Sequence, residues 1–389
     1  MRLSSFFNHF FLIGLSFGTA LAVRAETPAP TVPASASNLA FVTHKILTGQ
    51  PVRIGFIGGS ITQGSGVKSH GDCYYWLTKL RLTAFAKETN SPVETLLAAV
   101  GGTGSDYGVY RIGRQLLDKD IDLLVIEFAV NDGGNPAALD GMEGLVRQTL
   151  ERNPRTGIVI FDTTSKTMVA DSYDQGKVPP SVEAFHRVAL HYGLTEINAG
   201  PAVQAVLRDG KSRPELFFPD TVHPSKEGHA FYAGFLSDAL IAALKAASSA
   251  PVTLTPLPPP LGSGRLSRAR WQPIIAAEKT GDWTELKPNY YTSVGSWKTS
   301  AANSSISFDA AGERIVLLCV TGTRLHVTGP GIDKTITVRA RPGGIPTQQL
   351  IYDDAKPFSG RLTVTVLADD KGRADAELAG LAVISTSTP

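Results

Sequence analysis

Short apolar runs alternate with segments of helical periodicity through the first two thirds of the chain. Residues 121–128 are nearly continuous in Leu, Ile and Val, which is typical of a strand buried on both faces. Because strands and helices follow one another in turn, the pattern predicts an α/β domain with a parallel sheet covered by helices on both faces. The predicted strands are 52–57, 93–100, 121–128, 157–161 and 195–197, and the predicted helices are 73–88, 139–151, 181–191 and 225–246, the last with Ser225 as its N-cap.

Two proline-rich stretches divide the chain. Residues 26–38 and 249–264 favour extended, semi-rigid linkers, since their composition cannot build a core. We therefore expect a catalytic domain over residues 39–248 and an accessory domain over 265–389. The second domain has short strand-like segments separated by glycine turns, which predict a smaller all-β sandwich resembling a jelly roll. These segments are 314–318, 335–338, 361–366 and 378–384.

Residues 1–25 have the pattern of a secretory signal peptide. Arg2 precedes a short apolar run, and small residues surround the expected cleavage point at Ala25. The run is too short to span a bilayer, so we expect a secreted or periplasmic protein without stable membrane insertion. Removal of the peptide takes two of the 37 basic residues and none of the 35 acidic ones, which leaves a net charge of zero. This balance argues against nucleic acid as a partner.

Polar motifs follow the first three strands, and a fourth precedes the last helix. Ser60 stands in Gly-Gly-Ser-Ile-Thr, Gly102 in Gly-Gly-Thr-Gly-Ser, Asn131 in Val-Asn-Asp, and Asp220 and His223 in Asp-Thr-Val-His-Pro. Each motif alone is an ordinary turn, but the carboxyl ends of parallel strands meet at one edge of the sheet, where ligands bind. Together they contain the residues that an ester hydrolase needs: Ser60 as nucleophile, His223 as base and Asp220 as the carboxylate that orients His223. The N–H groups of Ser60 and Gly102 and the amide of Asn131 would form the oxyanion hole.

These four blocks resemble the SGNH subgroup of the GDSL esterases and lipases, which is named for its Ser, Gly, Asn and His. The resemblance covers residues 40–247 and implies a flavodoxin-like three-layer α/β/α fold and serine-esterase chemistry without a metal or cofactor. The first block departs from the family pattern, because Gly59 replaces an Asp and Ile61 a Leu; in the second block Leu97 replaces an Asn. The Gly-Gly-Ser-Ile-Thr form is similar to that of secreted carbohydrate esterases.

The sequence thus favours removal of acetyl groups from a polysaccharide or oligosaccharide, with the second domain holding the glycan or shaping the cleft. A lipase, lysophospholipase or thioesterase of the same fold is an alternative, although the polar segment 165–180 favours a hydrophilic substrate. An acetyltransferase and a carbohydrate-binding protein with a decayed site are further alternatives. Aromatic side chains of the second domain, mostly expected in its core, are candidates for stacking on sugars. They are Trp271, Trp283, Tyr290, Tyr291, Trp297 and Tyr352.

The remaining chemistry-bearing residues give weaker signals. We expect Cys73 and Cys319 to be buried thiols rather than a disulfide, because they lie far apart in the chain. His70 is a candidate for the mouth of the site, and no role is assigned to Glu127. No His, Asp and Glu set has zinc spacing. We expect helical positions for His186, His191 and His229.

Overall fold

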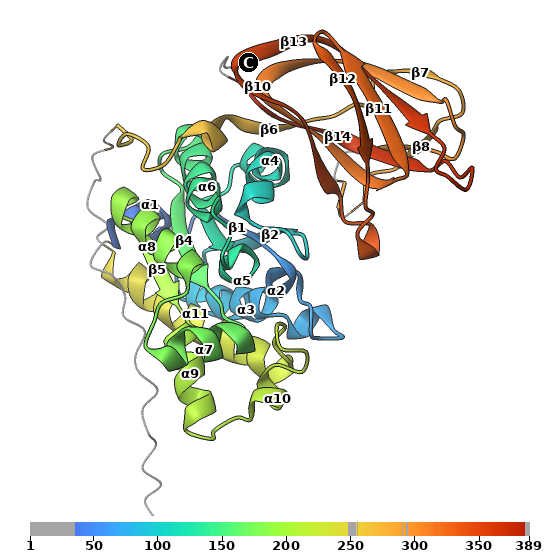
Figure 1. Cartoon of the computed structure of the whole chain (residues 1–389). Coiled ribbons are helices and arrows are strands. Elements are labelled where there is room, and N and C mark those ends of the chain that lie inside the picture. The colour runs from blue at the N-terminus through green and yellow to red at the C-terminus, as the bar shows by residue number, and fades with distance from the viewer. Residues whose placement is uncertain (1–35, 248–253, 255, 290, 293–294, 386–389) are drawn as a thin grey trace, which may run out of the picture.

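A computed structural model describes residues 36–247, 254, 256–289, 291–292 and 295–385 (Figure 1). The expected signal peptide and nearly all of the first linker lie outside this part of the chain. Within it, no helix is long and apolar enough to cross a membrane.

The first domain is built on a five-stranded parallel sheet with strand order β2-β1-β3-β4-β5. The chain leaves β1 to form β2 on one side and then returns to form β3 on the other. This reversal places a topological switch point between β1 and β3, where doubly wound proteins bind their ligands. The predicted α/β class is confirmed. The strands are β1 (Val52–Gly58), β2 (Val93–Ala99), β3 (Leu123–Glu127), β4 (Gly157–Asp162) and β5 (Thr195–Asn198).

Helices cover both faces of the sheet. Along β3, Leu124 and Ile126 pack on the layer formed by α4, α6 and α8, whereas Leu123 and Val125 pack on the layer formed by α1, α3 and α11. Both faces of β3 are therefore buried, which explains its unbroken apolar sequence. The helices are α1 (Ala40–Leu47), α2 (Ser60–Gln63), α3 (Tyr74–Ala86), α4 (Ser105–Gln115), α5 (Ala129–Asp132), α6 (Ala138–Arg152), α7 (Lys166–Asp171), α8 (Pro180–Tyr192), α9 (Gly200–Arg208), α10 (Pro214–Phe217) and α11 (Lys226–Ala246).

The second domain is all antiparallel β, as predicted. Its main sheet order is β12-β11-β13-β10-β14-β9-β8, with β6 paired to β14 and β7 to β10. The long strands β10 and β13 contain register shifts and curl the sheet around an apolar core (Figure 1). The strands are β6 (Ala269–Gln272), β7 (Glu278–Thr280), β8 (Thr284–Leu286), β9 (Ser296–Thr299), β10 (Ser305–Gly322), β11 (Arg324–Gly329), β12 (Ile332–Thr337), β13 (Thr347–Leu367) and β14 (Ala376–Ile384).

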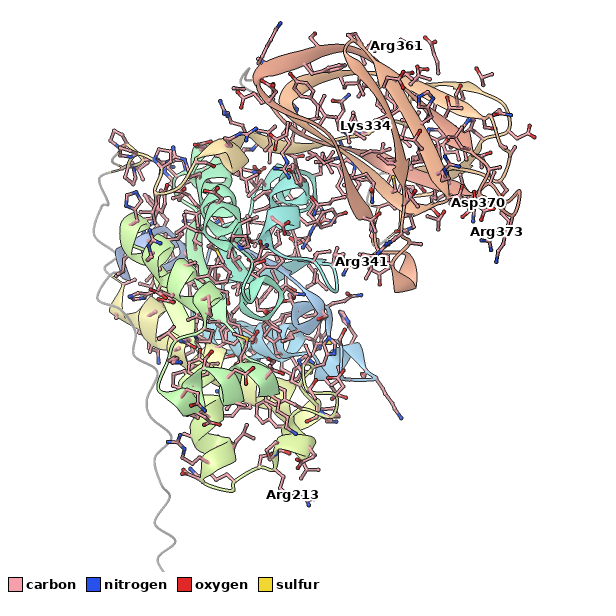
Figure 2. All side chains as sticks on the ribbon, viewed as in Figure 1. Arg213, Lys334, Arg341, Arg361, Asp370 and Arg373 are labelled. Atoms are coloured by element: carbon pink, nitrogen blue, oxygen red, sulfur yellow. The ribbon has the colours of Figure 1, made fainter. Side chains whose placement is uncertain are left out.

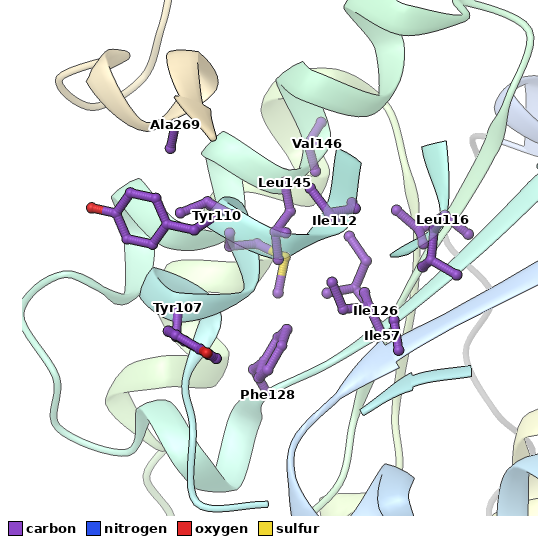
Figure 3. Packing of buried hydrophobic residues seen from close by; sticks show 14 of the residues in the cluster. Ile57, Tyr107, Tyr110, Ile112, Leu116, Ile126, Phe128, Leu145, Val146 and Ala269 are labelled. Carbon is purple, nitrogen blue, oxygen red and sulfur yellow. The ribbon is translucent and has the colours of Figure 1, made fainter. Parts of the chain in front are cut away.

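One face of β10 packs within its own domain, and the other packs on the first domain. Leu317 belongs to the core of the second domain, whereas Val316 and Leu318 belong to the cluster that contains α4 and α6. Trp271 of β6 completes the contact, with its ring edge-on to Tyr107 of α4 at 6.2 Å. Figure 3 shows part of this cluster, with Ala269 of β6 beside Tyr110 of α4. The two domains therefore share a continuous apolar interior.

Ion pairs surround this apolar contact. Asp353 of β13 pairs with Arg265 at 2.7 Å and with Arg314 at 3.2 Å. Glu313 pairs with Arg265 and with Arg268, at 3.7 and 3.4 Å. Because Arg265 and Arg268 directly follow the second linker, these pairs fix the point at which the chain enters the second domain.

Candidate active site

The turn after β1 places Ser60 at the edge of the sheet beside the switch point. Ser60 is the first residue of α2 and is 8% exposed. A Cβ on Gly58 would lie 2.1 Å from Thr62 Oγ1, and a Cβ on Gly59 would lie 1.8 Å from Asn131 Oδ1. Both positions therefore require glycine, which explains the Gly-Gly-Ser sequence of this turn.

His223 reaches this serine from the loop before α11. Its Nε2 lies 2.8 Å from Ser60 Oγ, and its Nδ1 lies 2.6 Å from Asp220 Oδ2. The loop between Asp220 and His223 turns tightly through Thr221, whose φ is +72°. Asp220 Oδ1 accepts the N–H groups of Val222 and His223, at 3.1 and 2.7 Å. The structure thus brings the predicted serine, histidine and aspartate into one chain of hydrogen bonds.

The charge on Asp220 determines which nitrogen of His223 carries the proton. Partial burial alone would raise the pKa of Asp220, but hydrogen bonds from the ring and backbone of His223 and from the Val222 N–H lower it overall. A carboxylate can only accept hydrogen bonds, so Nδ1 must donate. In the neutral ring, Nε2 is then free to accept the Ser60 hydroxyl proton.

The predicted oxyanion donors surround the same serine. Asn131, on α5, lies against Gly59, and a Cβ on Gly101 would lie 3.5 Å from Ser60 Cβ. Gly102 has a φ of +68° and is exposed, which turns its peptide at the surface of the site. Within the described residues, the N–H groups of Ser60 and Gly102 and the Asn131 amide have no protein acceptor. These donors therefore remain available to a ligand.

Glu127, to which the sequence assigned no role, supports the serine turn from below. It is fully buried at the end of β3, and it accepts the hydroxyls of Thr62 and Thr163 at 2.6 and 2.7 Å. Burial raises the pKa of Glu127, while these hydroxyls and the N–H groups of Thr62 and Gly59 oppose the shift. One carboxyl group thus ties the ends of β3 and β4 to the turn that carries Ser60.

Asp132 joins the loop of Asn131 to the loop of Gly102. Its Oδ1 accepts the Ser105 N–H at 3.0 Å, and its Oδ2 accepts the Ser105 hydroxyl at 2.5 Å. Burial raises the pKa of Asp132 to about 7, against the two hydrogen bonds from Ser105, which lower it. The spacing of the two predicted oxyanion loops is therefore set by a single buried carboxyl group.

Arg111 of α4 fixes the ends of two strands. It is 0% exposed, and its guanidinium donates to the carbonyl of Gly58 at 3.0 Å and to that of Ala98 at 2.5 Å. Its ring contacts are Tyr107 and Phe128, both with centroids 5.9 Å from the guanidinium carbon. This buried cation connects the C-terminal ends of β1 and β2 next to the site.

The other histidines lie outside the relay. Buried His229 of α11 accepts the Tyr74 N–H and donates to the Ser65 carbonyl, which fixes it as a neutral ring; burial also lowers its pKa. His186 pairs with Glu196 at 2.6 Å. His70 contacts Tyr75 and is exposed. His191 donates to the Pro259 carbonyl at 2.8 Å.

The two cysteines are buried free thiols, as expected, and four of the six aromatic residues pack in the interior of the protein. Cys73 and Cys319 are free and buried, and burial raises the pKa of Cys73 to about 11. Within the described residues, no group of three or more His, Cys, Asp or Glu side chains is arranged to hold a metal ion. Tyr290 lies outside the described residues, whereas Tyr291 contacts Gln63 of α2. Trp271 and Trp297 are buried, and Trp283 and Tyr352 pack against the core of the second domain.

The family comparison defines the class of the protein as a carboxylic ester hydrolase. Residues 56–231, which make up most of the first domain, match the model of the GDSL-like Lipase/Acylhydrolase family. The family resemblance of the sequence motifs is thereby confirmed. Among curated protein sequences, none matches the chain.

Solved structures share the two-domain arrangement. A two-domain esterase active on acetylated mannans, co-crystallised with mannopentaose, is similar with a TM-score of 0.76 and 19% identity, over 93% of this chain and 98% of that chain. A second structure of a two-domain esterase active on acetylated mannans gives a TM-score of 0.77 and 20% identity over the same shares. At this identity, the similarity establishes a common fold for both domains.

Proposed function

We propose that the protein is a secreted esterase that removes acetyl groups from an acetylated polysaccharide, with Ser60 as nucleophile, His223 as general base and Asp220 as its partner. The observation that carries this proposal is the 2.8 Å contact between Ser60 Oγ and His223 Nε2, continued by the 2.6 Å contact between His223 Nδ1 and Asp220. A hydroxyl, a neutral imidazole and a carboxylate in this order can generate an alkoxide nucleophile at neutral pH.

The first half of the reaction forms an acyl-enzyme. Ser60 Oγ attacks the acetyl carbonyl carbon while His223 Nε2 takes the hydroxyl proton. The carbonyl oxygen becomes an oxyanion, which the N–H groups of Ser60 and Gly102 and the amide of Asn131 stabilise. The C–O bond to the sugar then breaks, and His223 returns the proton to the leaving sugar oxygen. The acetyl group remains on Ser60.

The second half releases acetate. Water takes the place of the sugar hydroxyl, His223 removes one of its protons, and the water oxygen attacks the acetyl carbon. The second tetrahedral intermediate uses the same three donors. Its collapse breaks the bond to Ser60, and His223 returns the proton to Ser60 Oγ. Free enzyme and acetic acid result, and no other reactant is consumed.

The substrate class rests on three further observations. The similar two-domain structures belong to an esterase active on acetylated mannans, and both of its domains correspond to domains of this chain. The segment of the first domain over residues 165–180 is polar, which favours a hydrophilic substrate over a long acyl chain. The signal-peptide pattern of residues 1–25 supports export of the enzyme to a compartment where polysaccharides occur. We assign residues 39–248 to the catalytic domain and 265–389 to the accessory domain.

Acetate release from acetylated mannan and xylan, compared with hydrolysis of p-nitrophenyl esters of increasing chain length, tests the proposal. We expect acetate release from at least one polysaccharide and a steep loss of rate beyond short acyl chains. Hydrolysis only of long-chain esters would instead identify a lipase.

Substitution of the nucleophile tests the mechanism. Ser60→Ala should lower kcat by about 10⁴-fold or more while leaving the melting temperature nearly unchanged, because it removes only a hydroxyl at the surface of the site. The matched control is Ser69→Ala, at an exposed serine of the same loop region, which should retain full activity. Retained turnover in the Ser60 variant would reject the assignment.

A further inference from the structure

The accessory domain contacts the predicted oxyanion loop through Arg341. This residue follows β12, in the segment that leads to β13, and Figure 2 shows it extending from the second domain toward the first. Its guanidinium Nη2 donates to the Gly102 carbonyl at 2.6 Å. A Cβ on Gly102 would lie 2.5 Å from the same nitrogen, so the guanidinium lies directly against this glycine.

A second residue of the accessory domain reaches the other side of this loop. The Gly101 N–H donates to Gln63 Oε1 at 2.7 Å, and Gln63 Nε2 donates to the Tyr291 hydroxyl at 3.3 Å. Gln63 belongs to α2, the same short helix that begins with Ser60. The peptide groups before and after the Gly101–Gly102 peptide are therefore both held, one through Tyr291 and the other through Arg341.

The peptide between these two contacts carries the N–H of Gly102, the proposed oxyanion donor. The segment from 101 to 104 contains three glycines, so its backbone has little intrinsic stiffness. Gly102 itself has a φ of +68° and is exposed. An oxyanion donor contributes most when it is already oriented before the charge develops. The orientation of this one depends on groups outside the glycine segment.

We infer that Arg341 is a positioning residue for ester hydrolysis: it holds the Gly102 carbonyl, and through it the orientation of the preceding peptide, so that the Gly102 N–H points at the oxyanion. The inference rests on the proposed function. It gives the accessory domain a part in the chemical step, in addition to any contact with the polysaccharide. Because the arginine acts on the transition state through Gly102, its loss should lower kcat much more than it changes KM.

The test uses the full chain and p-nitrophenyl acetate, whose leaving group is too small to report on contacts with a polysaccharide. Arg341→Met keeps most of the side-chain length but removes the donor, and we expect about a tenfold fall in kcat with KM changed less than twofold. Arg341→Lys keeps a donor and should recover part of kcat. The matched control, Arg339→Ala, changes an exposed arginine two residues away and should leave both constants unchanged.

Several outcomes would overturn the inference. The first is a kcat for Arg341→Met within twofold of wild type on p-nitrophenyl acetate. The second is a raised KM on acetylated polysaccharide with an unchanged kcat on the small ester, which would make Arg341 a glycan contact. A third is a fall in kcat that is accompanied by a large fall in melting temperature, which would indicate a structural role. If Arg341→Met does not fold, Arg341→Gln takes its place, because its shorter amide side chain should not reach the Gly102 carbonyl, and an unchanged kcat there would also contradict the inference.

This experiment separates the inference from the function on which it rests. A wild-type enzyme that hydrolyses neither the small ester nor the polysaccharides would refute the proposed function. An active wild type with an active Arg341→Met variant would refute only the role of Arg341.

Discussion

Asp132 is a buried carboxyl group whose charge should set the pH dependence of stability near neutrality. It is 1% exposed, and burial raises its pKa from 3.8 to about 7. Between these two pH values the folded protein holds a proton that the unfolded chain releases. Folding therefore takes up a proton in this range, and the free energy of unfolding falls as the pH rises.

The size of this effect follows from the shift. A difference of about three pH units between the folded and unfolded pKa corresponds to about 4 kcal/mol, because each unit is worth about 1.4 kcal/mol. The stabilisation is fully present below about pH 4 and is lost by the time the pH has passed about 7. Asp132→Asn removes the titration but keeps the shape of the group. Its amide oxygen can accept the Ser105 N–H, and its nitrogen can donate to the Ser105 hydroxyl.

We therefore expect the stability of Asp132→Asn relative to wild type to increase by up to about 4 kcal/mol between pH 4 and pH 9. Denaturant unfolding, followed by the helical circular dichroism signal, measures this difference for the first domain, since α1–α11 all lie there. The control is Asp118→Asn at an exposed site, which should show no such trend. A difference between Asp132→Asn and wild type that stays constant within about 0.5 kcal/mol across this range would refute the reasoning.

Two further predictions concern the relay and the domain contact. The rate of ester hydrolysis should fall as the solution becomes more acidic, because only a neutral imidazole can accept the Ser60 proton. The pKa of Asp220 lies below its ordinary value, so this carboxylate stays ionised at neutral pH; a rate that does not change with pH would contradict the role of the imidazole. Leu318→Ala should destabilise the protein by about 2–5 kcal/mol, because this fully buried side chain lies between the domains. The exposed Leu350→Ala should leave the melting temperature unchanged, and an equal effect of both would show that the contact between domains contributes nothing.

The central elements of the first domain were predictable because local sequence determines them. The apolar run at 121–128 is typical of a strand buried on both faces, and it forms β3 (Leu123–Glu127). The last helix begins after Ser225, whose side chain accepts the Gly228 N–H as predicted for an N-cap. The predicted relay residues also lie where the ends of parallel strands converge.

The helix α4 was not predicted, because several of its residues are determined by tertiary contacts rather than by helix propensity. It contains Gly108, where a Cβ would lie 3.0 Å from the Phe128 ring, and Arg111, which is fully buried. Glycine and a charged residue in the middle of a helix both weaken the apolar pattern. The presence of these two residues is explained only by the folded sheet, since Gly108 packs on Phe128 after β3 and the Arg111 guanidinium binds carbonyls at the ends of β1 and β2.

The residues that support the site were beyond the reach of sequence reasoning for a similar reason. Glu127 and Asp132 read as a strand end and a turn residue, and their partners Thr163 and Ser105 lie 36 and 27 positions away. Arg341 lies 239 positions from Gly102 and belongs to the other domain. In the second domain, the predicted strand 314–318 is only part of β10 (Ser305–Gly322), because Asp309, Gly312 and Glu313 interrupt the apolar pattern on its N-terminal side.

Strands β10 and β14 each contribute side chains to the apolar interiors of both domains. The domains are therefore distinct in chain topology but are not independent in stability. All nine residues of β14 are buried, some against its own sheet and others against the first domain. Cutting the polypeptide at the proline-rich linker would therefore yield two fragments, each with an exposed apolar surface. The second domain therefore cannot be transferred to another enzyme by itself; it needs the surface of the first domain on which it packs.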